Sequence, residues 1–297
     1  MKTILILGAS GMLGHKVCQV LAEHGHQVFG TLRGPEFEAR RFGVFDGVDL
    51  VAGIDVLDDV ALRAEIESRR PDFVVNAVGI VKQRDQMSDP YSVVAVNSLL
   101  PHHLAKICRH IGARLIHVSS DCVFNGRRGN YGDSDPGDAE DLYGRSKLLG
   151  ETTSGEEEAL TLRTSFVGRE LKRPFHGLVE WLLSQQGGRV RGFANVIYSG
   201  LTSLELSRII LRVVEGPGEL CGTLQVASEP VNKYDLLHLI RDAYGLDIKI
   251  DRSETPRLDR SLVMDGFTAA TGYEAPKWSN MIQRMAEDRT PYDRIVR

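Results

Sequence analysis

A tyrosine and a lysine lie four residues apart, at Tyr143 and Lys147, in the stretch DLYGRSKLLGE. This stretch predicts the start of a helix, on which both side chains would project from one face about one turn apart. Because an ammonium group favours a nearby phenolate, we expect the pKa of Tyr143 to fall below its usual value of about 10. Such a tyrosine can protonate a carbonyl oxygen while another group delivers hydride. Many surface helices carry the same pair, so the pair alone does not define a function.

The N-terminal segment predicts a pyrophosphate site. An apolar, β-rich run, Thr3–Leu7, leads into a glycine-rich turn, and a helical pattern follows over residues 15–25. Glycines allow the backbone to approach phosphates, and the helix N-terminus offers unpaired N–H groups to an anion. The spacing is Gly-x-x-Gly-x-x-Gly, at Gly8, Gly11 and Gly14. Outside this strand–helix context, the motif would be an ordinary glycine turn.

The end of the second strand, residues 26–31, bears on the choice of cofactor. A site that prefers NAD usually places Asp or Glu here to bind the ribose 2′-hydroxyl. This chain has Thr31, Leu32 and Arg33 instead. A threonine beside a cation suits a 2′-phosphate, and Lys16 could assist, so we expect NADP to be preferred over NAD. The alternative is that Arg33 is a loop charge.

The third and fourth strands end in residues that suit a cofactor and a substrate. The third, residues 47–54, is followed by Asp55 and Val56, which are placed to meet the adenine edge. The fourth, residues 73–79, ends in small residues where the backbone must pass close to a ribose or phosphate. Lys82 and Gln83 follow it, beyond the carboxyl end of a strand, where open α/β sheets bind ligands. Substrate contact and simple solvation both remain open for these two side chains.

The fifth strand and its exit, residues 113–124, carry Ser119 and Ser120 at the carboxyl end. One of them would supply the hydroxyl that polarises a carbonyl beside Tyr143.

Strands and helices alternate up to this region, which predicts an α/β fold with a Rossmann-type doubly wound parallel sheet. The alternation fails after Arg163. We therefore expect an NADP-binding Rossmann domain over residues 1–165, with a return of the chain around 195–215, and a smaller C-terminal α/β substrate domain over residues 166–297. A helix is expected over 171–186, with Trp181 in its core face.

The composition excludes several classes of function. The chain has 297 residues, 42% hydrophobic and 26% charged, and a net charge of −4, so neither a nucleic acid nor a membrane is an expected partner. Its apolar runs are too short for a signal peptide or a membrane span. Four cysteines without Cys-x-x-Cys spacing indicate free thiols in a reducing cytoplasm, and they argue against a structural metal site.

Five motifs together resemble the extended short-chain dehydrogenase/reductases. Within that family the sequence is most similar to dTDP-4-dehydrorhamnose reductase and related nucleotide-sugar reductases. The similarity runs from residue 1 to about 215 and is weaker after that. The motifs are Gly8-x-x-Gly11-x-x-Gly14, Asn76-Ala77-Val78-Gly79, Ser119-Ser120-Asp121-x-Val123-Phe124, Tyr143-x-x-x-Lys147 and Arg163-Thr164-Ser165.

The resemblance implies a role for each matched position. Ser120 would be the catalytic hydroxyl, Tyr143 the general acid, and Lys147 the group that binds the nicotinamide ribose and tunes Tyr143. The other cofactor contacts would be Gly8, Ser10, Gly11, Met12, Leu13, Gly14, Arg33, Asp55, Val56, Asn76, Ala77, Val78, Gly79, Asn97, Ser119, Thr164 and Ser165. The substrate contacts would be Lys82, Gln83, Ser120, Asp121, Cys122, Tyr143, Phe166, Arg191 and Asn195.

The reaction implied is NADPH-dependent reduction of a nucleotide-diphosphate 4-keto-6-deoxy sugar in deoxysugar biosynthesis, by a protein compatible with a homodimer. Related 4,6-dehydratases carry Thr-Asp-Glu where this chain has Ser120, Asp121 and Cys122. A cysteine cannot replace that glutamate as the base, which argues against a dehydratase. Two alternatives remain. One is an epimerase of the same fold that retains its cofactor, and the other is a non-catalytic NADP-binding regulatory subunit.

Overall fold

In the computed structural model, the central element is a seven-stranded parallel sheet of strand order β11-β6-β5-β4-β1-β2-β3. The structure describes residues 1–36, 43–82, 85–152, 159–216 and 220–292. The strand order reverses between β1 and β4, as in doubly wound folds, and the Rossmann-type prediction is confirmed. The seven strands are β1 (Thr3–Leu7), β2 (Gln27–Thr31), β3 (Val48–Val51), β4 (Phe73–Asn76), β5 (Arg114–Val118), β6 (Ala159–Arg163) and β11 (Gly222–Gln225).

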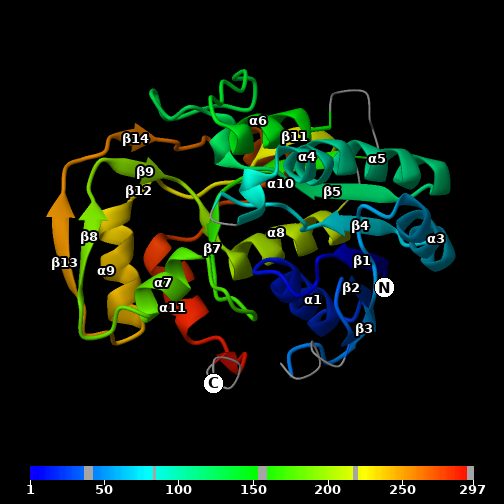
Figure 1. Ribbon diagram of the computed structural model, residues 1–297, viewed down its shortest axis with the longest axis horizontal. Coiled ribbons are helices and arrows are strands. Elements are labelled where there is room, and N and C mark those ends of the chain that lie inside the picture. Colours follow the sequence, from blue (N-terminus) through cyan, green and yellow to red (C-terminus); the bar gives the residue numbers. More distant parts are fainter. Residues whose placement is uncertain (37–42, 83–84, 153–158, 217–219, 293–297) are drawn as a thin grey trace.

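Helices cover both faces of this sheet, which explains the continuous apolar sequence of its strands. On one face Ile4 and Ile6 of β1 pack in the same core as α1 (Gly14–Glu23) and α8 (Ser203–Glu215). On the other face Leu5 and Leu7 pack with α3 (Asp59–Arg69) and α5 (Leu100–Ile111). The four β1 side chains are fully buried. The central strands therefore lie between two layers of helices (Figure 1).

The helical segment over residues 90–111 is not one continuous α-helix. After the 3-10 turn η1 (Asp85–Ser88), helix α4 (Pro90–Val94) is followed by a π-helical turn, η2 (Ala95–Leu99), and then by α5. Asp89 caps α4 by accepting from the Tyr91 N–H at 3.1 Å. π-Helical turns are frequent at functional sites, and this one carries the buried Asn97.

The predicted helix of Tyr143 and Lys147 is α6 (Leu142–Leu149), and its N-cap is Asp141, which accepts from the Gly144 N–H at 2.8 Å. The 3-10 turn η3 (Asp121–Val123) follows β5 and packs against the start of this helix. A Cβ on Gly144 would lie 2.2 Å from the carbonyl oxygen of Cys122, so no larger residue fits here. The helix therefore lies directly against the end of β5.

The second half of the chain forms small sheets and returns to the central sheet through α8 and β11. It packs into the same continuous core as the first half, and Figure 1 shows α7, α9 and α11 grouped beside the central layers. The proposed division at residue 165 stays a prediction. The remaining elements are β7 (Phe166–Val167), α7 (Leu178–Leu183), β8 (Arg189–Phe193), β9 (Val196–Tyr198), β10 (Leu201–Thr202), β12 (Val231–Asn232), α9 (Lys233–Ala243), β13 (Lys249–Ser253), β14 (Leu258–Asp259), α10 (Asp265–Thr271) and α11 (Trp278–Ala286).

The helix predicted over 171–186 is shorter than expected, and its buried face is different. The side chains of α7 that reach the core are Val179 and Leu182, whereas Trp181 is 42% exposed. The prediction that Trp181 lies in the core is therefore wrong.

No helix in the described part of the chain is long and apolar enough to cross a membrane.

Replacing Gly14 by alanine should strongly destabilise the fold, because a Cβ there would lie 2.1 Å from the Gly8 carbonyl oxygen. Relief of this overlap would separate α1 from β1, and we expect a loss of about 3 kcal/mol in the free energy of unfolding. Denaturant unfolding followed by circular dichroism measures this loss. Gly132→Ala is the matched control, since its Cβ would meet only Asp135 at 3.8 Å. Equal stability of the two variants would contradict the tight packing.

Candidate active site

The glycine-rich loop lies at the carboxyl edge of the sheet, against the exit of β4. Gly8 has φ +80°, a conformation that favours glycine, and a Cβ there would lie 2.9 Å from the Val78 side chain. Gly11 closes the turn by donating to the Gly8 carbonyl at 2.9 Å. The main-chain N–H groups of Met12 and Leu13 make no hydrogen bond with another described residue. The loop thus offers main-chain donors beside the N-terminus of α1, as an anion site requires.

The end of β2 supports this loop and only partly matches the role predicted for it. Thr31 is buried and its hydroxyl accepts from the Gly8 N–H at 3.3 Å, so it holds the loop and is not free to contact a 2′-phosphate. Lys16 is also buried; it forms an ion pair with Asp288, and its suggested contact with that phosphate is wrong. Arg33 is exposed and makes no ion pair with any described residue. Arg33 is therefore the one cation of the predicted set that could reach a 2′-phosphate.

The predicted adenine contacts lie at the neighbouring edge. Asp55 is exposed after β3, and its carboxylate accepts from the Leu57 N–H at 3.0 Å. Val56 packs against the core on the α3 side of the sheet. The Ile54 N–H donates to the Leu32 carbonyl at 3.0 Å, which joins the exits of β3 and β2.

The two asparagines predicted near the cofactor shape the β4 exit. The Asn76 side chain contacts the His117 ring nitrogen Nδ1 at 3.1 Å and accepts from the Val78 N–H at 3.1 Å. Asn97 binds both main-chain groups of Ile80 at 2.9 Å and donates to the Ser146 hydroxyl at 3.1 Å. The short segment 76–80, which contains Ala77 and Gly79, is thus fixed to β5 and to α6.

The structure distinguishes between the two serines at the end of β5. Ser119 donates to Glu151 at 2.8 Å, and the same carboxylate forms a buried ion pair with Arg163 at 2.7 Å. The Ser119 hydroxyl is therefore occupied within the protein. Ser120 donates to Asp121 at 3.1 Å, and its hydroxyl is close enough to Tyr143 to lower the pKa of that phenol. Of the two hydroxyls, only that of Ser120 lies beside the tyrosine.

The electrostatics of Tyr143 differ from the expectation. The pKa of Tyr143 is raised, chiefly by burial and then by the neighbouring Cys122 side chain, while the Ser120 hydroxyl opposes the rise. Lys147 is buried and donates to the Val118 carbonyl at 2.8 Å. Burial lowers the pKa of Lys147 to about 8. The expected fall in the pKa of Tyr143 is thus wrong for this structure, because desolvation outweighs the attraction of the lysine.

Lys82, a predicted substrate contact, lies beside the tyrosine. It donates to Asp141 at 2.6 Å, and its ammonium group is 5.6 Å from the centre of the Tyr143 ring. Gln83, the second candidate in this loop, lies outside the described residues. Lys82 therefore joins the β4 exit to the start of the tyrosine helix, beside the Tyr143 ring.

The turn η3 places two further candidates in the site. Asp121 is buried and its pKa is raised by burial, although the charges of Arg260 and Lys82 oppose this. Burial also raises the pKa of Cys122 to about 12, so the thiol stays protonated at neutral pH. Arg260 donates to the Phe124 carbonyl at 2.8 Å. It thereby places a cation near η3.

The residues after β6 border the same turn. Thr164 is buried, and its carbonyl accepts from the Asp121 N–H at 3.0 Å. The Ser165 carbonyl accepts from the Leu201 N–H at 2.9 Å, and Phe166 is partly exposed in β7. These three residues lie where the sequence placed them, at the carboxyl edge of the sheet.

One residue of the site was missed by sequence reasoning. Tyr198 of β9 has a buried hydroxyl that finds no hydrogen-bond partner among the described residues. The carboxylate of Asp121 acts on its pKa, which is raised mainly by burial. β9 has three residues and no motif, so only the tertiary structure reveals this phenol.

The structure does not place two of the predicted substrate contacts near η3 and α6. Arg191 is exposed on β8, opposite Asp251 of β13. Asn195 donates to the main chain and the carboxylate of Glu254, at 2.8 and 3.0 Å. Within the described residues, no hydrogen bond or ion pair joins either side chain to η3 or α6. Their predicted roles stay predictions.

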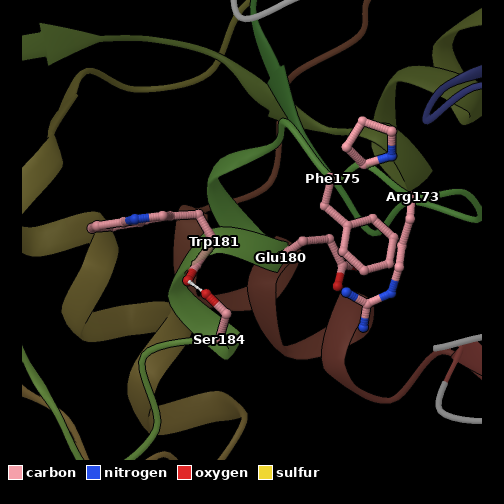
Figure 2. Close-up of a pocket in the computed structure, with 6 residues that line it drawn as sticks. Arg173, Phe175, Glu180, Trp181 and Ser184 are labelled. Atoms are coloured by element: carbon pink, nitrogen blue, oxygen red, sulfur yellow. Dashed lines mark hydrogen bonds between the residues drawn. The ribbon is translucent and has the colours of Figure 1, made fainter. Parts of the chain in front are cut away.

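A pocket of about 530 Å³ lies at α7 and the loop before it (Figure 2). In Figure 2 the Trp181 side chain points away from Phe175 and Arg173. None of the lining residues belongs to the predicted site, so this pocket is formed by a different segment of the sequence from those that carry Ser120 and Tyr143. Its lining comprises Arg173, Pro174, Phe175, Glu180, Trp181 and Ser184.

Comparison with known proteins places the chain in a family. The profile described as RmlD substrate binding domain matches residues 1–290. The chain belongs to this family. A dTDP-4-dehydrorhamnose reductase of Streptomyces griseus is 33% identical over 50% of this chain and 43% of its own length. A protein named Probable low-salt glycan biosynthesis reductase Agl14, of Haloferax volcanii, is 30% identical over 86% of this chain and 85% of its own.

Solved structures share the fold over nearly the whole chain. A dTDP-4-dehydrorhamnose reductase of Bacillus anthracis in complex with NADP has a TM-score of 0.78 at 16% identity, covering 96% of this chain and 99% of its own. These comparisons confirm the resemblance stated for the sequence and, at the level of class, the expectation of an NAD(P)-dependent oxidoreductase.

Two further matches bear on the alternatives. A UDP-glucose-4-epimerase of Stenotrophomonas maltophila with bound NAD has a TM-score of 0.78 at 15% identity and covers 97% of each chain. The methionine adenosyltransferase 2 subunit beta of Xenopus laevis is 30% identical over 54% of this chain and 45% of its own.

The lowered pKa of Lys147 predicts a dependence of stability on pH. With a pKa of about 8 when folded and the ordinary 10.5 when unfolded, the unfolded state binds more protons between these values. The folded state therefore gains stability as pH rises, by roughly 2 kcal/mol between pH 7.5 and 9.5. Urea unfolding of the wild type and of Lys147→Met at both pH values measures this, since only the wild type should show the gain. Parallel curves for the two proteins would refute the lowered pKa.

Proposed function

We propose that the protein is an NADPH-dependent reductase of a nucleotide-diphosphate 4-keto-6-deoxy sugar, in deoxysugar biosynthesis. The observation that carries the proposal is the placement of Ser120, just after β5, against Tyr143 in the first turn of α6, with the buried Lys147 one helical turn further along that helix. These are the hydroxyl, acid and cation that reduction of a carbonyl requires, and they lie at the edge of the sheet where doubly wound folds bind ligands.

The glycine-rich loop fits a dinucleotide. The N–H groups of Met12 and Leu13 are available for a pyrophosphate, and the left-handed Gly8 admits the backbone turn. Ala77 and Gly79 would border the nicotinamide half, and Asp55 and Arg33 the adenosine half. The remaining members of the predicted cofactor set would support these contacts.

The residues of the chain act on the carbonyl oxygen. When bound, the reduced cofactor supplies hydride to the carbonyl carbon. Tyr143 gives its proton to the oxygen, which is consistent with a raised pKa that keeps the phenol protonated. Ser120 hydrogen-bonds the same oxygen, which stabilises the developing negative charge. Lys147 holds the nicotinamide ribose, and Lys82, Asp121 and Phe166 border the sugar.

The alternatives are weaker but testable. An epimerase would need Tyr143 to act as a base in its oxidising half-reaction, which a raised pKa disfavours. A regulatory subunit would not need the Ser120–Tyr143–Lys147 set, which is complete here. The homodimer and the cytoplasmic location stay predictions.

The deciding assay follows NADPH absorbance with a panel of nucleotide 4-keto-6-deoxy sugars, with NADH in parallel. Stoichiometric oxidation on one sugar establishes the reductase and its substrate. No oxidation on any sugar, with a dinucleotide retained through purification, would favour the epimerase. No oxidation and no binding of a dinucleotide would reject the proposal.

The variant Tyr143→Phe should bind NADPH with unchanged affinity and lose about 10²- to 10⁴-fold in kcat, because the general acid is removed. Steady-state assays and a fluorescence titration of NADPH measure the two quantities. Tyr91→Phe is the control, as that tyrosine is 81% exposed. A Tyr143→Phe enzyme with the wild-type rate would refute the proposed acid.

The variant Arg33→Ala should raise the KM for NADPH about tenfold or more and leave the KM for NADH within about twofold. A charge-assisted hydrogen bond to the 2′-phosphate, worth about 1.5–3 kcal/mol, would be lost. Arg189→Ala removes an exposed arginine of β8 and serves as the control. If the KM values for NADPH and NADH change by the same factor, Arg33 does not bind the 2′-phosphate.

A further inference from the structure

We propose that Tyr292 and His15 are positioning residues that hold the glycine-rich loop in its phosphate-binding conformation from the far end of the chain. The two side chains and the loop form one hydrogen-bonded series. Tyr292 Oη lies 2.7 Å from His15 Nε2, and His15 Nδ1 lies 2.7 Å from the Gly11 carbonyl oxygen. The inference rests on the proposed function for the identity of the dinucleotide.

The partners of His15 determine where its proton lies. The Gly11 carbonyl can only accept, so Nδ1 must carry the hydrogen and Nε2 of the neutral ring must accept. Tyr292 is then the donor to Nε2. Burial lowers the pKa of His15 to about 3, so the ring stays neutral at physiological pH. The series therefore runs in one direction, from the Tyr292 hydroxyl through the imidazole to the Gly11 carbonyl.

The Gly11 carbonyl matters because it shares a planar trans peptide with the Met12 N–H. In such a peptide the C=O and N–H bonds point in opposite directions. A carbonyl held toward His15 therefore aims the Met12 N–H away from it, on the side of the loop that is open to an anion. The N–H of Gly11 is bound to the Gly8 carbonyl at 2.9 Å, so both peptides that flank Cα of Gly11 are fixed.

The C-terminal segment 288–292 is built to keep Tyr292 in place. Asp288 forms a buried ion pair with Lys16 of α1, and the Lys16 ammonium also donates to the Thr290 hydroxyl at 2.7 Å. The Arg169 guanidinium lies 4.6 Å from the centre of the Tyr292 ring. Tyr292 and His15 are 4% and 0% exposed. The segment is thus attached to α1 at two consecutive residues, His15 and Lys16.

Nothing in the fold of α1 itself requires these contacts. The helix is already packed on β1, β2 and α8. The Gly11 carbonyl also accepts from the His15 main-chain N–H at 3.2 Å, and the buried histidine and tyrosine add a shorter side-chain hydrogen bond to the same oxygen. Binding of a dinucleotide to a loop already in its bound conformation avoids the cost of ordering it.

The test compares Tyr292→Phe, His15→Phe and His15→Asn by fluorescence titration of NADPH and by cofactor KM and kcat. We expect Tyr292→Phe to raise the Kd about fivefold and His15→Phe to raise it at least as much, since each loses a hydrogen bond of about 1 kcal/mol. The shorter amide of His15→Asn can still donate to Gly11 but no longer reaches Tyr292, so its Kd should rise about as much as in Tyr292→Phe and less than in His15→Phe. With saturating NADPH, kcat should change little in all three variants.

The matched control is Tyr273→Phe, which removes a tyrosine hydroxyl hydrogen-bonded to Glu205 at 2.7 Å, away from the loop. Its Kd should equal that of the wild type. Wild-type affinity in Tyr292→Phe and His15→Phe would overturn the inference, and so would equal weakening by His15→Asn and His15→Phe. The titration needs no sugar, so it decides the positioning role independently of whether the proposed sugar reduction is observed.

Discussion

The close approach of α6 to the end of β5 is the constraint on which the site depends. There is no space for a side chain between Gly144 and the Cys122 carbonyl, so the first turn of the helix lies directly against η3. This contact brings the phenol of Tyr143 to the hydroxyl of Ser120. Asp141 fixes the start of the helix through its cap and also receives Lys82. A change that lifts the helix would move Tyr143 and Lys147 together away from Ser120.

Behind this contact the polar groups are satisfied within the protein. Glu151 receives both Ser119 and Arg163, and Asn97 joins the β4 exit to α6. Removing one partner of such a buried pair leaves an uncompensated charge, which costs much more than losing a surface ion pair. These residues carry no reactive group toward the open edge of the sheet. They fix the positions of their neighbours, which explains why two serines that look alike in sequence have different surroundings.

Much of this arrangement could be predicted because it is local or periodic in the sequence. The apolar strands, the glycine turn and the four-residue spacing of Tyr143 and Lys147 led to the sheet and to the helix that carries this pair. Interactions between distant residues could not be read in this way. His15 and Tyr292 are 277 positions apart, and Lys16 pairs with Asp288 at the same end. The π-helical turn at Asn97 and the exposed Trp181 depend on neighbours that periodicity does not reveal.

The pKa of Tyr143 shows how packing can reverse an argument from spacing. A lysine one turn away should favour the phenolate, but Lys147 is bound to the Val118 carbonyl, and burial dominates at the tyrosine. A phenol that remains protonated is suited to giving a proton to an oxygen that becomes an alkoxide. Reduction requires only that the tyrosine donate a proton, whereas epimerisation also requires it to accept one in the oxidising step. The same desolvation that overturns the expected pKa shift therefore suits the proton donation that the proposed reduction requires.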